Sequence, residues 1–228
     1  MVTTTNAGTP VMARRSTAGL ALAGGLAFLL FYLASTFLRG MVTDRALPQP
    51  TAADGIIRAY YAHEAAGVLV NDACMLLSVA GLAVFMVAFR RVLGARAETR
   101  RATWGHAAGT FAVAAMVVSV VLAAVLTFGA ASMTDATAGT FEMAIFWSGG
   151  VAHVVALGVY AWLVGGLYDG LAIRVLAAVA AVPAVLSLLS LAIYMASALI
   201  LLGRLLCMAW TVAAAISLLR GRRQAVRG

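Results

Sequence analysis

Residues 18 to 38 form an uninterrupted run of 21 residues without a charged side chain. A helix needs about 20 apolar residues to cross the hydrocarbon core of a bilayer, whereas the core of a secretory signal peptide has about 7–15. The run therefore predicts a retained membrane anchor, with a cleaved signal peptide as the alternative. The whole chain agrees, because 64% of its 228 residues are hydrophobic and only 11% are charged. This composition excludes a disordered chain, a nucleic-acid-binding domain and a secreted disulfide scaffold, which need many charges or many cysteines.

Further apolar runs predict an all-α, polytopic membrane bundle of six transmembrane helices. The run from Val175 to Leu219 is interrupted only by Arg204. One helix of that length would be about twice as long as the hydrocarbon core is thick, so we expect two spans, a turn near residues 195 to 203, and Arg204 snorkelling to the outer interface. The runs do not alternate polar and apolar residues, which excludes a β-barrel. The predicted spans are 18–38, 65–89, 104–130, 142–167, 174–194 and 203–219. They form a predicted transmembrane domain at 17–220. A mobile cytoplasmic tail at 1–16 precedes this domain, and a basic cytoplasmic tail at 221–228 follows it.

The arginines indicate how this bundle is oriented. All 16 basic residues are arginines, and six spans place both termini on one side of the membrane. That side then holds twelve of the sixteen arginines, and the other side holds Arg39, Arg45, Arg58 and Arg204. The positive-inside rule places the arginine-rich side in the cytoplasm. We therefore expect a multi-pass protein of a bacterial plasma membrane with both termini cytoplasmic, and topology explains the net charge of +8 better than a polyanionic partner does.

The segment between the first two spans contains prolines and charges, so it must leave the membrane. Thr51 to Asp54 has the spacing of a helix capping box, with Asp in place of the usual Glu. Apolar and aromatic residues then recur on one helical face at Ile56, Ile57, Tyr60 and Tyr61. This pattern predicts a short interfacial helix that runs straight into the second span, with both tyrosines at headgroup level.

Ionisable residues within the spans are the best candidates for a functional site, because a charge at bilayer depth costs roughly 2.5–3.5 kcal/mol on insertion scales. Glu142 and His153 are eleven residues apart, which brings them onto one face of a regular helix, and Glu64 and Asn71 share a face by a seven-residue spacing. The functional interpretation is an outward-opening polar cavity between the second and fourth spans, lined by His63, Glu64, Asn71, Asp72, Glu142 and His153. The alternative is that Glu64 and Glu142 are solvated helix starts, while Asp72 and His153 make interhelical hydrogen bonds.

No motif for catalysis, metal binding or cofactor binding accompanies these residues. His63-Glu64 lacks a second histidine four residues on, and the chain has no GxSxG, CxxC or GxxxxGK motif. The three histidines fall at different depths, which argues against a haem. We therefore expect no cofactor, no metal and no catalytic residue, and we interpret Cys74 and Cys207 as packing residues.

Small residues predict close helix packing. Glycine pairs occur at 24–25, 149–150 and 165–166, and Gly105 and Gly109 have the GxxxG spacing. In lipid, small residues let helix backbones approach one another, and ordinary packing is the simplest interpretation here. Pro183 removes a backbone hydrogen bond and predicts a kink in the fifth span.

Two short sequences carry a resemblance to a family. Ile57-Arg58-Ala59-Tyr60-Tyr61 leads into the second span, which ends in Phe89-Arg90-Arg91-Val92-Leu93. Together with the six spans and the proline-containing first loop, they resemble the uncharacterised six-span integral membrane proteins of high-GC Gram-positive bacteria, a family without an assigned function. The resemblance implies the six-span fold and an actinobacterial source. It carries over no site residue.

The sequence favours a membrane component without catalytic activity over an enzyme. Three roles fit this class: a small permease-like protein, a lipid-interacting protein or a membrane-regulatory protein. The alternatives are an intramembrane enzyme that uses the outward-facing His/Asp/Glu cluster, and a structural subunit of a larger membrane complex. The expected partners are membrane lipids and either a second copy of the chain or a partner membrane protein, and nucleic acid is not expected.

Overall fold

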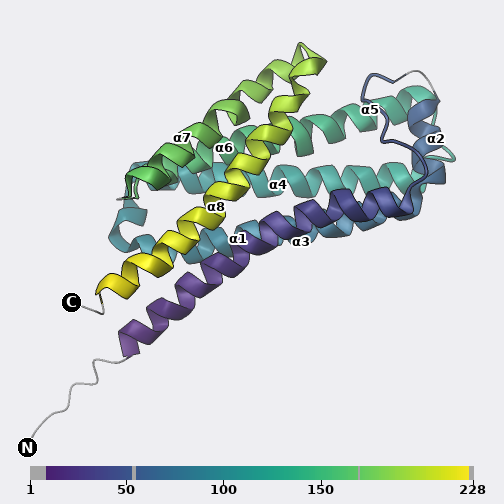
Figure 1. Cartoon of the computed structure of the whole chain (residues 1–228). Coiled ribbons are helices and arrows are strands. Elements are labelled where there is room, and N and C mark those ends of the chain that lie inside the picture. Colours follow the sequence, from purple (N-terminus) through teal and green to yellow (C-terminus); the bar gives the residue numbers. More distant parts are fainter. Residues whose placement is uncertain (1–8, 53–54, 169, 226–228) are drawn as a thin grey trace, which may run out of the picture.

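The computed structural model describes residues 9–52, 55–168 and 170–225, and these residues form a bundle of long helices (Figure 1). Six helical segments are long and apolar enough to cross a membrane, and the described residues include no strand, so the predicted all-α bundle of six spans is confirmed. The six segments are Ser16–Val42, Ala65–Leu93, Arg100–Gly129, Asp135–Gly165, Leu171–Leu191 and Met195–Arg220.

The described residues form eight α-helices and four short helical segments. In chain order these are α1 (Thr9–Val42), α2 (Ile56–His63), α3 (Ala65–Leu93), η1 (Gly94–Glu98), α4 (Arg100–Gly129), α5 (Asp135–Ile145), η2 (Phe146–Ala152), α6 (His153–Gly165), α7 (Leu171–Leu186), η3 (Ser187–Leu191), η4 (Tyr194–Ser197) and α8 (Ala198–Ala225). Of these, α2 and η1 lie outside the spans. The fourth span is composite, because α5 and α6 are joined by η2, which is a π-helix.

Several predicted boundaries shift. α1 begins at Thr9, within the predicted tail at 1–16, of which residues 1–8 lie outside the described residues. α8 continues to Ala225, within the predicted tail at 221–228, of which 226–228 also lie outside them. The turn between the last two spans comes earlier than the predicted 195 to 203. η3 ends at Leu191 and η4 begins at Tyr194, because the chain winds there into 3₁₀ segments, which are tighter than an α-helix.

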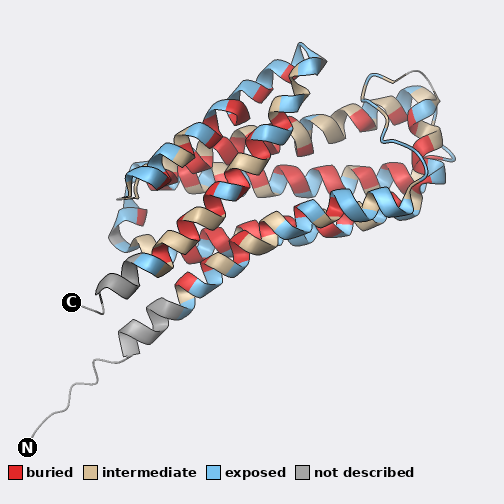
Figure 2. Ribbon diagram, viewed as in Figure 1, coloured by how far each residue is buried: buried red, intermediate tan, exposed pale blue. Residues whose placement is uncertain are grey.

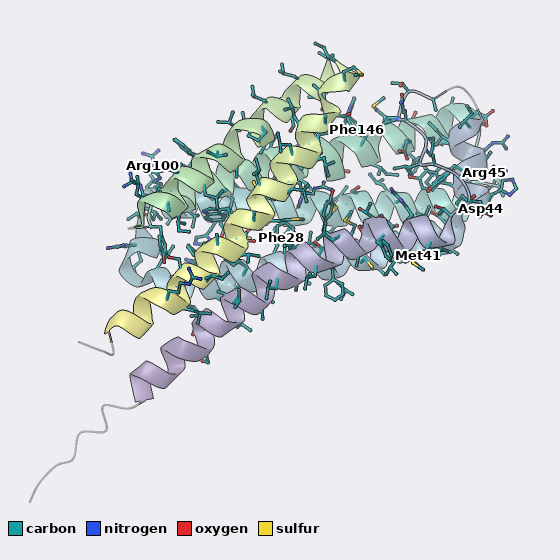
Figure 3. The ribbon with its side chains drawn as sticks, viewed as in Figure 1. Phe28, Met41, Asp44, Arg45, Arg100 and Phe146 are labelled. Carbon is teal, nitrogen blue, oxygen red and sulfur yellow. The ribbon has the colours of Figure 1, made fainter. Side chains whose placement is uncertain are left out.

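The beginning of α1 and the end of α8 lie at one end of the bundle, which we call the terminal end (Figure 1). α2 and the loop at residues 43–52 lie at the opposite end, which we call the loop end. Asp44 and Arg45 are at the loop end and Arg100 is at the terminal end (Figure 3). That both termini lie on one side of a membrane, and that this side is the cytoplasm, stay predictions.

The helix between the first two spans differs from its prediction. α2 begins at Ile56, after Gly55 with φ 85° and ψ −24°, and no side chain caps it. Thr51 therefore does not cap the helix, and Ala53 and Asp54 lie outside the described residues. Glu64 (φ −103°, ψ 25°) separates α2 from α3, so the helix is not continuous into the second span. Tyr60 and Tyr61 are buried among apolar residues of α3, α4 and α5, and their position at headgroup level stays a prediction.

α1 and α3 pack with their backbones in close contact. A Cβ atom built on Gly24 would lie 2.6 Å from the backbone nitrogen of Phe85, and one built on Gly81 would lie 2.6 Å from that of Phe28. Real Cβ atoms do not approach this closely, so only glycine permits this spacing of the two helices. The predicted packing role of the first glycine pair is confirmed at Gly24.

The two halves of the bundle are filled differently. In the half nearer the terminal end, Phe85, Phe89, Tyr160 and Trp210 are fully buried and form a cluster of ring contacts from α3, α6 and α8. Buried residues follow the inward faces of the helices, and exposed residues follow the outward faces (Figure 2). The half nearer the loop end contains the buried charged residues Glu64, Asp72, Glu142 and Arg204. This half holds the candidate site.

Candidate functional site

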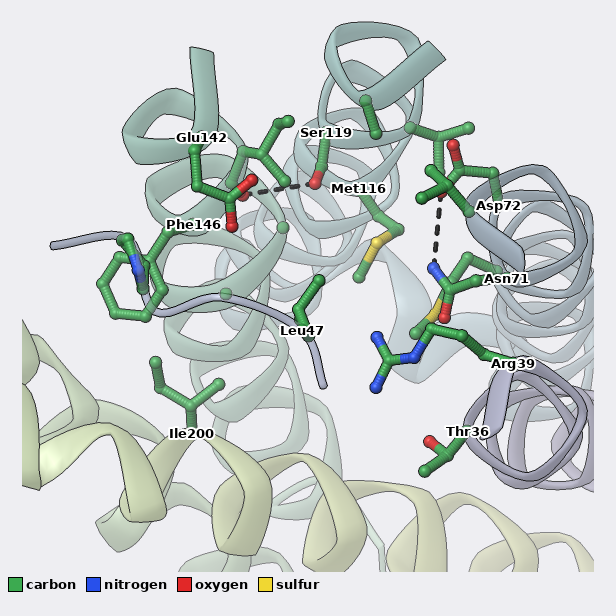
Figure 4. A pocket seen from close by; sticks show the side chains of 18 of the residues that line it. Thr36, Arg39, Leu47, Asn71, Asp72, Met116, Ser119, Glu142, Phe146 and Ile200 are labelled. Atoms are coloured by element: carbon green, nitrogen blue, oxygen red, sulfur yellow. Dashed lines mark hydrogen bonds between the residues drawn. The ribbon is translucent and has the colours of Figure 1, made fainter. Parts of the chain in front are cut away.

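A cavity of about 380 Å³ lies in the loop-end half of the bundle (Figure 4). Its walls come from α1, α2, α3, α4, α5, η2, η4 and α8, and the loop before α2 contributes Leu47, Pro48 and Pro50. The volume falls within the range of roughly 300–1,000 Å³ that is typical of small-molecule sites. The cavity combines apolar walls with four charged side chains, which are Arg39, Asp72, Glu142 and Arg204.

One wall holds a short hydrogen bond between Glu142 and Tyr61. The Tyr61 hydroxyl donates to Oε2 of Glu142 over 2.6 Å, and both residues are buried. This distance is typical of a hydroxyl that donates to an ionised carboxylate. Burial, together with the neighbouring Glu142 carboxylate, raises the pKa of Tyr61 well above its ordinary value, so the hydroxyl stays a donor at physiological pH. Burial also raises the pKa of Tyr60, which lies beside it.

Asp72 lies on the α3 wall and is only partly satisfied. It is 6% exposed, and its Oδ1 accepts a hydrogen bond from Nδ2 of Asn71 over 3.4 Å. Its Oδ2 is buried without a hydrogen-bond partner. Buried carboxylates normally have all their oxygens hydrogen-bonded, so this wall has spare capacity for a donor.

Arg204 enters the cavity from α8 instead of snorkelling to the interface. It is 8% exposed, and one of its terminal nitrogens donates to the backbone carbonyl of Gly149. Its guanidinium carbon lies 5.2 Å from the centre of the Tyr32 ring, within cation–π range. Its Nε is buried without a partner. The predicted interfacial position is therefore wrong, because a carbonyl and a ring inside the bundle attract the guanidinium.

Arg39 lies on the same face of α1 as Tyr32 and Thr36, at spacings of three and four residues. Its guanidinium points into the cavity toward Leu47 and Met116 (Figure 4). The single ion pair among the described residues joins Arg58 to Asp135 over 2.6 Å and lies outside the cavity. The four charged groups of the cavity therefore form no ion pair with one another.

The π-helix shapes the wall opposite α3. In a regular α-helix, the N–H of His153 would donate to the carbonyl of Gly149. Here it donates to the carbonyls of Ser148 and Gly150, which leaves the Gly149 carbonyl available to Arg204. Ser119 of α4 donates to the carbonyl of Ile145 over 3.2 Å and fixes the start of the π-helix against α4. π-helical turns occur frequently at functional sites.

Three of the six residues predicted from the sequence line this cavity, namely Asn71, Asp72 and Glu142. His63 is exposed at the end of α2, outside the cavity. Glu64 is buried, and its Oε2 accepts the backbone N–H of Asp44 over 3.3 Å, so it anchors the loop. His153 is fully buried elsewhere, with Nδ1 2.8 Å from the carbonyl of Ala112. The π-helix winds more residues per turn than an α-helix, so the eleven-residue spacing does not bring His153 onto the cavity face.

The arginines and the tyrosine of the site were not predicted from the sequence. Arg39 and Arg204 lie beside the ends of the predicted spans 18–38 and 203–219, where arginine usually marks topology, and Tyr61 lies outside the spans. The spacing of Tyr32, Thr36 and Arg39 on one helical face was the available signal. Among the described residues, no group of three or more His, Cys, Asp or Glu side chains is arranged to hold a metal ion. Cys74 and Cys207 are buried and free, as their interpretation as packing residues requires.

Comparison with protein families finds no matching family model, and comparisons with characterised proteins and with solved structures find no similar protein. The fold and the cavity therefore define the class of this protein, which is a six-span helical membrane protein. The function has to be argued from the cavity itself.

Proposed function

We propose that the protein is a small permease-like or lipid-interacting component of a bacterial plasma membrane, and that it binds a ligand in the loop-end cavity without converting it. The observation that carries this proposal is one intramembrane cavity in which Arg39, Arg204, Asp72 and Glu142 converge without an ion pair among them. Charged groups at bilayer depth are costly and usually mark a binding site or a pathway. The enzyme alternative uses a His/Asp/Glu cluster, and both of its histidines, His63 and His153, lie outside the cavity, so the geometry favours binding over catalysis.

The cavity is proposed to face away from the cytoplasm. The support is the arginine distribution, since seven of the described side chains at the terminal end are arginines, namely Arg90, Arg91, Arg96, Arg100, Arg101, Arg174 and Arg220. The positive-inside rule favours a cytoplasmic terminal end. The resemblance to six-span proteins of high-GC Gram-positive bacteria supports the assignment to a plasma membrane.

Accessibility from outside the cell tests this proposal. The background variant carries C74S and C207S, and one cysteine is introduced at Ser119, whose side chain lines the cavity. We expect a small, membrane-impermeant methanethiosulfonate added to intact cells to modify the S119C variant. The matched control is V118C, one residue earlier on α4, whose side chain is half exposed on the outer face of the bundle and outside the cavity. A thiol in contact with lipid is not ionised, so V118C should stay unmodified.

Ligand occupancy is measured on the same protein by native mass spectrometry. We expect a small molecule to be retained by the purified wild-type chain. The V120W variant, which fills part of the cavity, should lose it, and the V118W variant should keep it. An unreactive S119C variant, or a retained mass that V120W leaves unchanged, would contradict the proposal.

A further inference from the structure

The charge of Arg204 lacks a counter-charge. A guanidinium keeps its proton at every pH relevant to proteins, and an uncompensated buried charge is strongly unfavourable. Among the described residues, Arg204 contacts one carbonyl and one aromatic ring, His153 is close enough to interact with it electrostatically, and its Nε has no partner. None of these groups carries a negative charge. These contacts orient the guanidinium but leave its charge unneutralised.

The carboxyl groups of the cavity do not remove this excess. Neither Asp72 nor Glu142 forms an ion pair with Arg204 or Arg39. Glu142 already accepts the Tyr61 hydroxyl as a carboxylate. Asp72 can avoid its charge by binding a proton, whereas neither guanidinium can lose one. With Glu142 ionised and Asp72 protonated, the two guanidinium groups and one carboxylate leave one positive charge, and an anion that is not part of this chain can compensate it.

The remaining walls indicate the other part of the ligand. Leu47, Met116, Phe146 and Ile200 surround the space into which Arg39 points (Figure 4). Apolar walls around a fixed charge suit an amphiphile, whose apolar part is buried while its charged group binds an arginine.

We propose, building on the binding function proposed above, that the cavity binds an amphiphile with an anionic phosphate or carboxylate group. Arg204 and Arg39 bind the anionic group, and the apolar part lies against Leu47, Phe146 and Ile200. Arginine suits this role because its planar fork of donors matches the oxygens of phosphate and carboxylate. The anionic group can belong to a lipid headgroup or to a free solute.

Probe binding to the purified full-length protein in detergent tests the proposal. The probes are dihexanoyl phosphatidate, dihexanoylglycerol, which has the same chains without the phosphate, and inorganic phosphate. Affinity is measured from the concentration dependence of the thermal unfolding midpoint. We expect phosphatidate to raise the midpoint and dihexanoylglycerol to leave it unchanged. A response to inorganic phosphate as well would indicate that a free anion is sufficient, and a response to phosphatidate alone would indicate a lipid headgroup. Either result supports the proposal.

Arginine variants locate the binding. A charge-assisted hydrogen bond is worth about 1.5–3 kcal/mol, so R204Q should weaken phosphatidate binding by about tenfold to a hundredfold, and R39Q should do so by about tenfold. R58Q is the matched control, because it removes a positive charge at the same end of the bundle but outside the cavity. If R204Q does not fold, the R39Q variant alone tests the proposal. Arg39 is only partly buried, so its replacement should perturb folding less.

The proposal is overturned if phosphatidate does not bind, if it binds no better than dihexanoylglycerol, or if R39Q and R204Q both bind it as wild type does. Each of these results would show that the ligand is not an anion bound by the two arginines. The cysteine accessibility and mass measurements above do not depend on the charge of the ligand, so they report separately on whether the cavity binds a ligand at all.

Discussion

Replacement of Tyr61 by phenylalanine tests the most sharply defined contact in the cavity wall. The variant keeps the buried ring and removes the hydroxyl that donates to Glu142 over 2.6 Å. A hydrogen bond to an ionised group contributes about 1.5–3 kcal/mol, whereas one between neutral groups contributes about 0.5–1.5 kcal/mol. Interhelical hydrogen bonds inside membranes average about 0.6 kcal/mol and reach about 1.7 kcal/mol, and a short bond to an ionised group belongs above that average. We therefore expect Y61F to lower the free energy of unfolding by about 1.5–3 kcal/mol.

A second background separates the charge from the hydrogen bond. Glutamine at position 142 keeps an acceptor but has no charge, so Y61F should cost only about 0.5–1.5 kcal/mol in the E142Q protein. Y168F is the matched control, because the Tyr168 hydroxyl donates to the neutral Ser217 hydroxyl over 2.9 Å. It should cost about the same amount with Glu or Gln at position 142. The free energies come from steric trapping of the unfolded state in bicelles.

Alkaline pH gives an independent reading of the same contact. The pKa of Tyr61 is raised above its ordinary value of 10.0 by burial and by Glu142, so above pH 10 the unfolded chain loses this proton before the native protein does. The native state then binds more protons than the unfolded state, and stability falls as pH rises. The contribution of Tyr61 is therefore fully present below pH 10 and declines above it, and the stability difference between wild type and Y61F should shrink there. Equal costs of Y61F in both backgrounds, with a difference that does not change above pH 10, would refute the reasoning.

Three further predictions address orientation, the buried polar pair and the close helix contact. Reporter fusions at the C-terminus and next to Thr51 should report opposite sides of the membrane, and equal sidedness would contradict the six-span topology. D72L should fold with near-normal yield and lose the retained ligand mass, whereas H153L should keep the mass and lose about 0.6–1.7 kcal/mol of stability, because only Asp72 lines the cavity. G24L should lower stability by about 1–3 kcal/mol through overpacking against α3, while G19L, where a Cβ meets no atom within 4 Å, should change it little in the same unfolding assay.

The spans were predictable because the length of an apolar run is a one-dimensional constraint that the bilayer imposes directly. Burial of Asp72 and His153 within the bundle was predictable for the same reason, since lipid offers their polar atoms no partner, and it is confirmed. Their different partners were not predictable. Asp72 faces the cavity and His153 faces α4, and this difference depends on a π-helix that regular helical periodicity does not include.

Arg204 shows how tertiary contacts override a local rule. Its position near the start of a span predicts a side chain that reaches toward the interface. In the bundle, α8 already begins at Ala198, so Arg204 lies six residues into that helix, at the depth of the π-helix on the fourth span. The attraction comes from a backbone carbonyl, which every residue possesses and no sequence pattern marks.

The π-helix and Arg204 each supply a hydrogen-bond partner that the other needs. A π-helical turn leaves the Gly149 carbonyl without the N–H of His153, and an unpaired carbonyl in the membrane interior is unfavourable. A buried guanidinium needs acceptors just as strongly, and the two groups satisfy each other only in part, because a single carbonyl carries no net charge. The same contact connects α8 to the fourth span, and the ring of Tyr32 connects both to α1. An anion bound at Arg204 would therefore contact the point where these three elements meet, so its binding should stabilise the loop-end half of the bundle as well as neutralise the charge.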